Sequence, residues 1–541
     1  MHLRNFLIFP IFLFVLNSGL KAQTKEITLL EIIQKAVAAS PGEKLYYNNY
    51  TINKTKFQYK YLFEYFKRRV NPELRTLEEG RLLIPANISF RNCHFTSLLL
   101  DRVKLTGELK FSNCTFEGDI EIINSEINQF QLENSKTKHL IIIDAKFNDY
   151  CVLQLNTLQN LNIAKSAFYG VNWFINDIET EISIEKCVFH PVKNECNILS
   201  DSIGYGRPIN NNLQVAIESM NRSTIPYLNI RNCEFLSNSN INKVNIQADL
   251  IELIIEDNLF QSAIDMHGSS IEKRLIFRSN HLGNYIGFND VIFTEFFNML
   301  EWDQFAGNKI CIFEDTPPDL VKDCPNNFGF RGIDDDKAIL YLAENYEELE
   351  NQNAYRLLIS IYQRLFNIYK SNGDIKSSNG CYSEMKDVQS RMLKHRFSNS
   401  RTFDNFFRLK LAQLLKIYVN YGTDPARAIT ISVWVVLIFG IFYFFFPSEW
   451  DVASKSKLIN DFKSFIDRNE KGYYKPFLSM VLGFLISLLN ALTLSLNSFV
   501  TLGFGNIPTR GLARYICIIQ GFIGWFLLSI FTVALINQVL A

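Results

Sequence analysis

A short repeat between residues 88 and 168 constrains the fold more strongly than any other feature of this sequence. A small residue and a bulky apolar residue stand two positions apart, and such a pair returns about every ten residues. Apolar residues also recur at steps of five, which matches neither a helix nor a strand. The pattern instead predicts a solenoid in which each short side points one bulky residue inward and about twenty residues complete a turn.

An Asn or Asp often precedes the small residue, as at Asn92, Asn113 and Asp144. The later pairs are weaker copies, and an insertion near residues 191–225 separates them. The pattern resembles pentapeptide-repeat and right-handed parallel β-helix proteins, which implies a right-handed parallel β-helix over residues 80–295. The pairs are Cys93/Phe95, Val103/Leu105, Cys114/Phe116, Ser125/Ile127, Ser135/Thr137, Ala145/Phe147, Ser166/Phe168, Cys187/Phe189, Cys233/Phe235 and Asn258/Phe260.

The cysteines divide into two groups. Four of the ten occupy the small slot of the repeat, which Ser and Ala fill elsewhere, so we expect them to be buried for their small size. No CxxC or paired Cys/His spacing predicts a zinc or redox site. A disulfide in an oxidising compartment is possible among Cys196, Cys311 and Cys324, but the sequence does not pair them.

We expect a helical segment at 23–79 before the β-helix and a linker at 296–336 after it. Residues 337–422 then change to a helical period with a break at 371–374, which predicts an α-helical hairpin resembling one tetratricopeptide unit. Apolar and basic residues share the stretch 403–416. This composition fits an amphipathic helix at the membrane interface, and it equally fits an ordinary packed helix.

Residues 423–541 have the composition of a membrane domain. The runs 428–446 and 515–541 contain no charged residue, and the first has the length that a transmembrane helix needs. A third apolar stretch, 476–500, leads directly into a glycine-rich segment. We therefore expect a multi-pass membrane protein whose partners include the lipid bilayer.

The glycine-rich segment reads TLGFGN at residues 501–506. Removing the water shell of a potassium ion requires a row of oxygen atoms, which extended backbone carbonyls can supply. Such a row places alternate residues in left-handed backbone conformations, where glycine carries no strain. Gly503 and Gly505 stand at alternate positions, as this geometry requires.

The segment resembles the TVGYGD selectivity filter of potassium channels, in the GFGN variant that some members carry. The resemblance covers about residues 420–541 and implies a two-transmembrane pore domain with a re-entrant pore helix at 489–500. It also implies a homotetramer, because one filter strand cannot enclose an ion, and potassium as the permeant ion with no further metal. By this resemblance the ion-binding residues are Thr501, Leu502, Gly503, Phe504 and Gly505, the filter supports are Asn497, Asn506 and Pro508, and the inner-helix hinge is Gly524.

The sequence departs from the family at several of these positions. Leu502, Phe504 and Asn506 replace the family's Val, Tyr and Asp, and Asn497 stands where some members have a carboxylate. By the resemblance, Asn506 in place of this Asp would alter inactivation or the rigidity of the filter. It does not remove the row of backbone carbonyls.

Neither catalysis nor a cofactor is predicted. The seven histidines are scattered without an HExxH motif, and GxSxG, Walker A and GxGxxG motifs are absent. Basic and acidic residues number 55 each, so there is no electrostatic reason to expect nucleic acid as a partner.

The first 22 residues resemble a signal peptide, with Arg4 before an apolar stretch at 6–16 and Ala22 at the expected cleavage point. The alternative is a short retained anchor. A cleaved signal places the β-helix outside the cytoplasm and inverts the pore. The flank 391–427 holds eight Lys or Arg and two acids, which places it in the cytoplasm by the positive-inside rule. We favour the extracytoplasmic orientation because large domains translocate regardless of charge.

Two functions account for these features. The first is a potassium-selective channel in the plasma or inner membrane of a bacterial-type cell, whose β-helix serves assembly, sensing or the binding of a ligand or protein. The second is a membrane-anchored β-helix that binds or adheres without conduction. We favour the channel, because an anchor has no use for glycines at alternate positions before a second span.

Cleavage after Ala22 should leave Gln23 as the first residue of the mature protein. The β-helix should then be digested by protease added to intact spheroplasts. N-terminal sequencing and protease accessibility measure the two outcomes. An intact Met1 with a protected β-helix would contradict the inverted orientation and leave the channel hypothesis standing.

Overall fold

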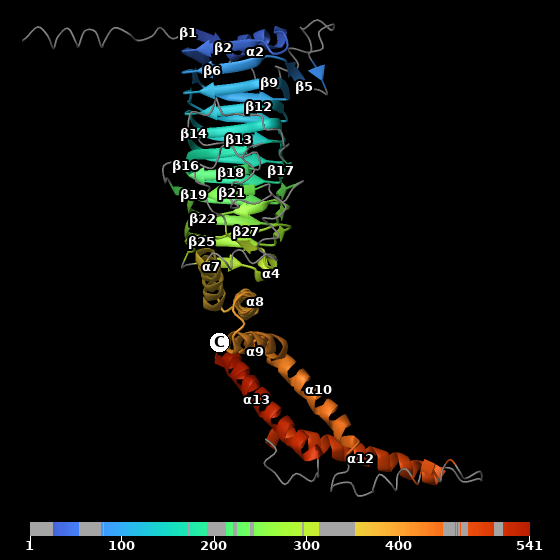
Figure 1. Ribbon diagram of the computed structural model, residues 1–541. Coiled ribbons are helices and arrows are strands. Elements are labelled where there is room, and N and C mark those ends of the chain that lie inside the picture. Colours follow the sequence, from blue (N-terminus) through green and yellow to red (C-terminus); the bar gives the residue numbers. More distant parts are fainter. Residues whose placement is uncertain are drawn as a thin grey trace, which may run out of the picture. The chain divides into compact units, whose positions relative to one another are not determined.

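The computed structural model describes residues 25–53, 77–78, 81–170, 172–191, 213–219, 224–237, 243–294, 297–312, 352–446, 460, 462–463, 466, 474–501 and 512–540. The chain divides into two compact units, Met1–Asn372 and Gly373–Ala541. The first contains a parallel β-solenoid of about ten turns, and the second is α-helical (Figure 1). The predicted signal peptide, residues 1–22, lies outside the described residues.

The described part of the first unit holds one continuous sheet and three helices. The helices are α2 (Leu29–Ala38), α4 (Trp302–Phe305) and α7 (Gln352–Ser371). The strands are β1 (Lys25–Thr28), β2 (Lys44–Asn48), β3 (Tyr50–Asn53), β4 (Leu77–Glu78), β5 (Arg81–Ile84), β6 (Asn87–Arg91), β7 (His94–Phe95), β8 (Leu98–Asp101), β9 (Val103–Ser112), β10 (Thr115–Phe116), β11 (Ile120–Ile123), β12 (Glu126–Glu133), β13 (Lys136–Ile143), β14 (Lys146–Ala164), β15 (Ala167–Phe168), β16 (Asn172–Glu185), β17 (Val188–Phe189), β18 (Leu213–Ser219), β19 (Thr224–Arg231), β20 (Glu234–Phe235), β21 (Lys243–Gln247), β22 (Asp249–Glu256), β23 (Leu259–Phe260), β24 (Ala263–Asp265), β25 (Ser270–Arg278), β26 (His281–Leu282), β27 (Ile286–Gly287), β28 (Phe297–Leu300) and β29 (Ile310–Cys311).

The predicted parallel β-helix is confirmed, and it extends beyond the predicted range of 80–295. Its first coil includes β1, β2 and β3, where β2 pairs with β6 and β3 pairs with β7. Residues 25–53 thus hold three strands and one helix, whereas a helical segment was expected there. The first coil carries Tyr50 in the slot that Cys93 fills in the next coil, so the small-residue signal is missing from the sequence.

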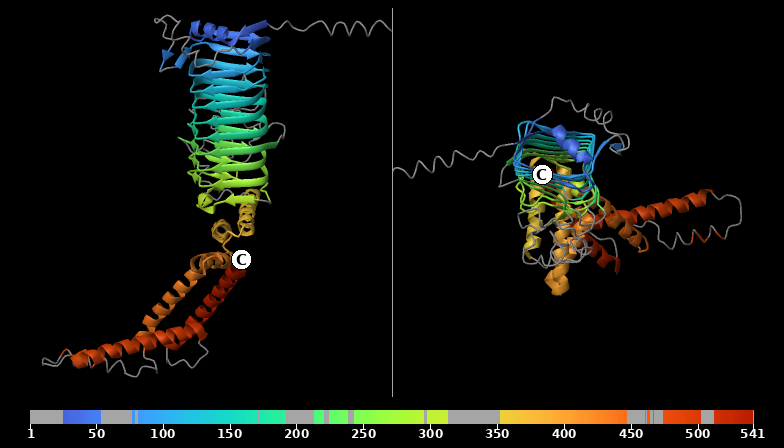
Figure 2. Two further views of the ribbon diagram at one scale, coloured as in Figure 1. Left: turned by 180° about the vertical axis from the view of Figure 1, so that it is seen from behind. Right: turned by 90° about the horizontal axis from the view of Figure 1, so that it is seen from above.

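The inward positions of the coils are those that the repeat predicts. Both members of every pair are buried, as are Ile122 and Leu132 from the five-residue rhythm. Phenylalanine rings of successive coils stack along the solenoid, with centroids 4.9 Å apart between Phe168 and Phe189. The coils share a four-sided outline in the view along the axis (Figure 2).

The corners of the coils explain the Asn and Asp residues of the repeat. Asn113 and Asn134 have φ values of 55° and 44°, in the left-handed region that Asn adopts more readily than most residues. The residue after each corner is the small slot. There the backbone N–H of Cys114 donates to Ser135 Oγ of the next coil at 3.0 Å. That hydroxyl donates in turn to the Glu133 carbonyl at 2.7 Å.

Where Ser fills the slot, it therefore supplies a hydrogen-bond acceptor as well as a small side chain, whereas Ala145 fills it by size alone. Asn side chains fill it in later coils, where Asn258 Oδ1 accepts from the N–H of Cys233 at 2.8 Å. Asn280 Oδ1 accepts from the N–H of Asn258 at 3.1 Å. A buried N–H without such a partner would be destabilising. Size alone, which the sequence pattern shows, gives an incomplete account of these positions.

The sheet register continues across the insertion. Cys114 and Ser135 are 21 residues apart, whereas 46 residues separate Cys187 from Cys233. The N–H of Cys187 nevertheless reaches the Cys233 sulfur at 3.5 Å, and β17 pairs with β20. The additional residues therefore do not shift the register of the ladder.

Eight cysteines lie among the described residues, and all eight are free thiols. Cys93, Cys114, Cys187 and Cys233 are buried in the slot, as predicted. Cys311 is also free and buried, and burial raises the pKa of its thiol well above the usual value. Cys196 and Cys324 lie outside the described residues.

Helices cover the first and last coils of the solenoid. Helix α2 begins after Thr28, whose Oγ1 accepts from the Glu31 N–H, and it buries Leu29 and Ile33. Helix α7 buries Leu365, and its Arg364 guanidinium donates to the Val291 carbonyl at 3.1 Å. Each end of the solenoid thus has a helix packed against it.

The second unit consists of helices whose starts follow local signals. Asp374 caps α8 through the N–H of Ser377, directly after the predicted break at 371–374. The predicted hairpin is thus divided, since α7 belongs to the first unit and α8 to the second. The helices are α8 (Ile375–Asn399), α9 (Phe403–Val419), η4 (Asn420–Gly422), α10 (Pro425–Phe444), α12 (Tyr474–Thr501) and α13 (Leu512–Leu540).

Substituting Ser135 with Ala should lower the free energy of unfolding by about 1–3 kcal/mol, because the buried N–H of Cys114 loses its acceptor. Ser89→Ala, at an outward position, is the control and should change little. Cys114→Ser should be nearly neutral, whereas Cys114→Leu should cost about 1–3 kcal/mol by overpacking. Urea unfolding of the full-length protein, followed by circular dichroism, measures all four variants. A neutral Ser135→Ala would contradict the hydrogen-bonding requirement of the slot.

Candidate membrane-embedded site

Three helices of the second unit are long and apolar enough to cross a membrane. Within the described residues they are Pro425–Phe444, Val481–Thr501 and Leu512–Gln538. Helix α12 packs against both α10 and α13, and α10 and α13 also contact each other. The chain therefore has the character of a multi-pass membrane protein.

Three of the predicted pore residues lie within the described helices α12 and α13. Thr501 is the last residue of α12, Asn497 lies one turn earlier, and Gly524 lies in α13. The remaining filter and support residues lie outside the described residues: Leu502, Gly503, Phe504, Gly505, Asn506 and Pro508.

The expected pore helix at 489–500 forms the C-terminal part of a longer helix. Helix α12 runs without interruption for 28 residues, because Pro476 lies in its first turn and no later residue breaks it. Its buried residues fall on one stripe that begins at Ser487 and ends at Phe499. Leu482 and Phe484, nearer the start, are half exposed. Among the side chains of α12 that the structure describes, the buried ones thus lie in its C-terminal half.

A buried polar network joins the three helices. Tyr443 of α10 donates its hydroxyl to Gln520 Oε1 of α13 at 2.8 Å. The Gln520 amide donates to Ser495 Oγ of α12 at 2.7 Å and to the Ser495 carbonyl at 3.0 Å. Ser495 Oγ donates in turn to the Val436 carbonyl of α10 at 2.8 Å. Polar groups in an apolar environment need such partners, so the network fixes how the helices face one another.

None of Tyr443, Ser495 and Gln520 was among the predicted site residues. Each of the three apolar segments contains several polar residues, so the sequence alone does not single out the three that meet.

Two glycines permit close approach of the helices. A Cβ on Gly524 would lie 2.1 Å from the Phe499 backbone oxygen, and a Cβ on Gly440 would lie 2.5 Å from the Leu492 side chain. Close packing thus accounts for Gly524 without a hinge, and the hinge role stays a prediction. The contact holds the C-terminal turns of α12 against α13.

The end of α12 presents a cation-favouring environment. Thr501 Oγ1 donates to the Asn497 carbonyl at 2.6 Å, so this hydroxyl is engaged within the helix. The Asn497 side chain is half buried. A helix C-terminus carries a partial negative charge, which stabilises cations nearby. The TLGFGN segment starts at this end.

A second cluster connects α8 to the start of the spans. Asp387 of α8 accepts from Lys416 at 2.8 Å and from the Tyr421 hydroxyl at 3.0 Å. Burial, followed by the charge of Asp387, raises the pKa of Tyr421. Tyr418 and Ser432 share a hydrogen bond of 2.9 Å that ties α9 to α10.

The sequence left two interpretations of segment 403–416, an interfacial helix and an ordinary packed helix, and the exposure of α9 differs between its two ends. Phe403 and Phe407, near its start, are exposed by 81% and 56%. Tyr418 and Val419, at its end, are buried. The first turns thus resemble an interfacial helix, and the last turns pack against α10.

Comparisons with protein-family models, curated proteins and solved structures find no match to this chain. The geometry of its own residues therefore carries the functional argument. In the described ranges, no group of three or more His, Cys, Asp and Glu is placed to hold a metal ion.

Gly524→Ala should destabilise the helical unit by about 1–3 kcal/mol or more, because the new methyl group overlaps backbone atoms of Phe499. Ser529→Ala, at an exposed position of the same helix, is the matched control. The thermal unfolding midpoint of the purified protein in detergent is the measurement. Equal midpoints for the two variants would show that Gly524 is not required for packing.

Proposed function

We propose that this chain is the subunit of a potassium-selective channel in which four copies enclose one pore. The TLGFGN segment lies between α12 and α13, where a filter would lie in the potassium-channel family. Potassium ions are the proposed cargo, and the proposal includes neither catalysis nor a cofactor. The protein would act in the plasma or inner membrane of a bacterial-type cell.

The observation that carries the proposal is the anchoring of α12 at its C-terminal end. Phe499 packs directly on Gly524, and Thr501 follows within the same turn. The negative end of the helix is thereby held at the start of the glycine-rich segment. A rigid helix C-terminus stabilises a dehydrated cation next to backbone carbonyls.

In this proposal, the C-terminal half of α12, which holds its described buried residues, is the re-entrant pore helix. Four copies are needed because one filter strand supplies oxygens on only one side of an ion. Exposed apolar side chains on α13, such as Phe522 and Val533, would then face lipid or neighbouring copies.

The solenoid would serve as a sensing or assembly domain outside the cytoplasm, since the proposed signal peptide directs it there. Its coupling to the pore would pass through α8 and the Asp387 cluster, which contacts the turn before α10. The second function, a membrane anchor without conduction, would use the same spans and leave the glycines unexplained.

The purified protein in planar bilayers should show a reversal potential near the potassium equilibrium potential when sodium is the other cation. Gly505→Ala should abolish or weaken this selectivity, because alanine strains a left-handed backbone position. Ser529→Ala should not. Current with equal permeability to both ions would reduce the proposal to a cation pore. No current, together with only monomers and dimers in native mass measurements, would favour the anchor.

A further inference from the structure

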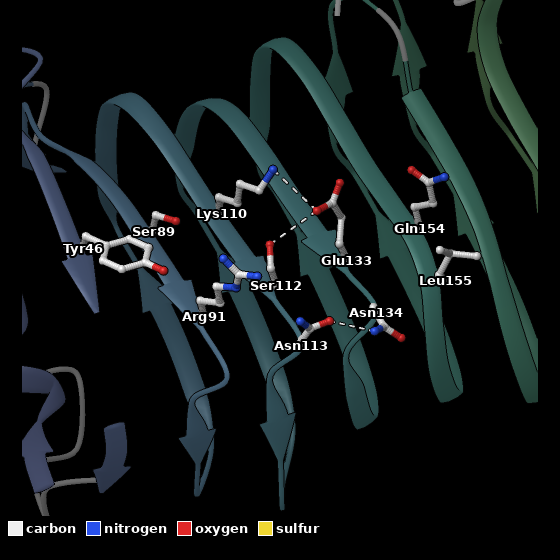
Figure 3. A pocket seen from close by; sticks show the side chains of 10 residues that line it. All are labelled: Tyr46, Ser89, Arg91, Lys110, Ser112, Asn113, Glu133, Asn134, Gln154 and Leu155. Carbon is white, nitrogen blue, oxygen red and sulfur yellow. Dashed lines mark hydrogen bonds and ion pairs between the residues drawn. The ribbon is translucent and has the colours of Figure 1, made fainter. Parts of the chain in front are cut away.

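A shallow groove runs across the outer surface of the first coils (Figure 3). It encloses about 460 Å³ and crosses five strands, β2, β6, β9, β12 and β14. Neighbouring strands lie about 4.8 Å apart, so the groove is roughly 19 Å long. This shape suits a linear, extended ligand better than a compact ion.

Among the described residues, one cation of the groove has no charged partner. Glu133 accepts from Lys110 at 3.4 Å and from Ser112 Oγ at 3.3 Å, which neutralises the carboxylate and fixes its position. Arg91 is exposed, and its guanidinium makes no hydrogen bond or ion pair with any described residue. A guanidinium in this position is suited to bind a carboxylate through paired hydrogen bonds.

The other lining residues offer an aromatic face and amide groups. Tyr46 lies at one end of the groove with 57% of its surface exposed. At the corners of the coils, Asn134 Nδ2 donates to Asn113 Oδ1 at 2.6 Å. This bond does not use Asn113 Nδ2 or Asn134 Oδ1, which can bond to a ligand. Gln154 adds a third amide. Amides can both donate to and accept from hydroxyl groups.

We propose that this groove binds an acidic oligosaccharide. A uronate carboxylate would pair with Arg91, the apolar face of a sugar ring would stack on Tyr46, and the hydroxyl groups would bond to the corner amides. One free cation does not make the Arg cluster that recognises phosphorylated ligands, which favours a carboxylate. The proposal does not depend on ion conduction, because the groove lies wholly within the solenoid.

The test is isothermal titration calorimetry of the full-length protein in detergent with a short linear oligogalacturonate. A neutral malto-oligosaccharide of the same length is the comparison ligand. The acidic probe should bind saturably and the neutral one much more weakly. Arg91→Ala should weaken binding of the acidic probe about tenfold or more, since it removes a charge-assisted contact. Arg91→Lys should give an intermediate value, because it keeps the charge and loses the paired geometry.

Two exposed residues elsewhere on the solenoid supply matched controls. Lys138→Ala removes one positive charge on β13, and Tyr227→Ala removes an exposed aromatic ring on β19. Both should bind like the wild type, whereas Tyr46→Ala should bind less tightly. Circular dichroism checks that each variant is folded. Absence of saturable binding, or equal losses in Arg91→Ala and Lys138→Ala, would overturn the proposal whether or not the protein conducts ions.

Discussion

Hydrogen bonds between successive coils hold the first unit together. Along the flat sides the sheet ladder satisfies the backbone. At the corners a left-handed Asn or Asp often turns the chain, and at several of them the next N–H donates to a Ser or Asn side chain of the following coil. Ser135 and Asn258 meet this need in two chemically different ways. The phenylalanines inside stack at a distance that matches the spacing of hydrogen-bonded strands, which the ladder sets.

The periodic part of the solenoid could be predicted because one inward residue per side is visible in the sequence. The first coil could not, because Tyr50 stands where the repeat would show a small residue. The hydrogen bonds of the slot were hidden, since Cys, Ser and Ala are alike in size. The break between α7 and α8 was predicted from local signals.

The packing of the membrane helices could not be predicted, for a different reason. A uniformly apolar helix does not reveal which face is buried, so the positions of Tyr443, Ser495 and Gln520 relative to one another had no sequence signature. The length of α12 was not predicted, because the family resemblance implied a short pore helix at 489–500, whereas the helix runs over Tyr474–Thr501. The two units nevertheless follow one rule, in which a buried polar group on one segment is satisfied by a neighbouring segment.

The 46-residue step between Cys187 and Cys233 has a consequence for how such a protein changes over generations. Because the ladder re-forms in the same register after the detour, the cost of added chain is mainly loop entropy, which grows slowly with length. Insertions of different lengths between β17 and β18 are therefore expected to leave the stacked coils on either side aligned.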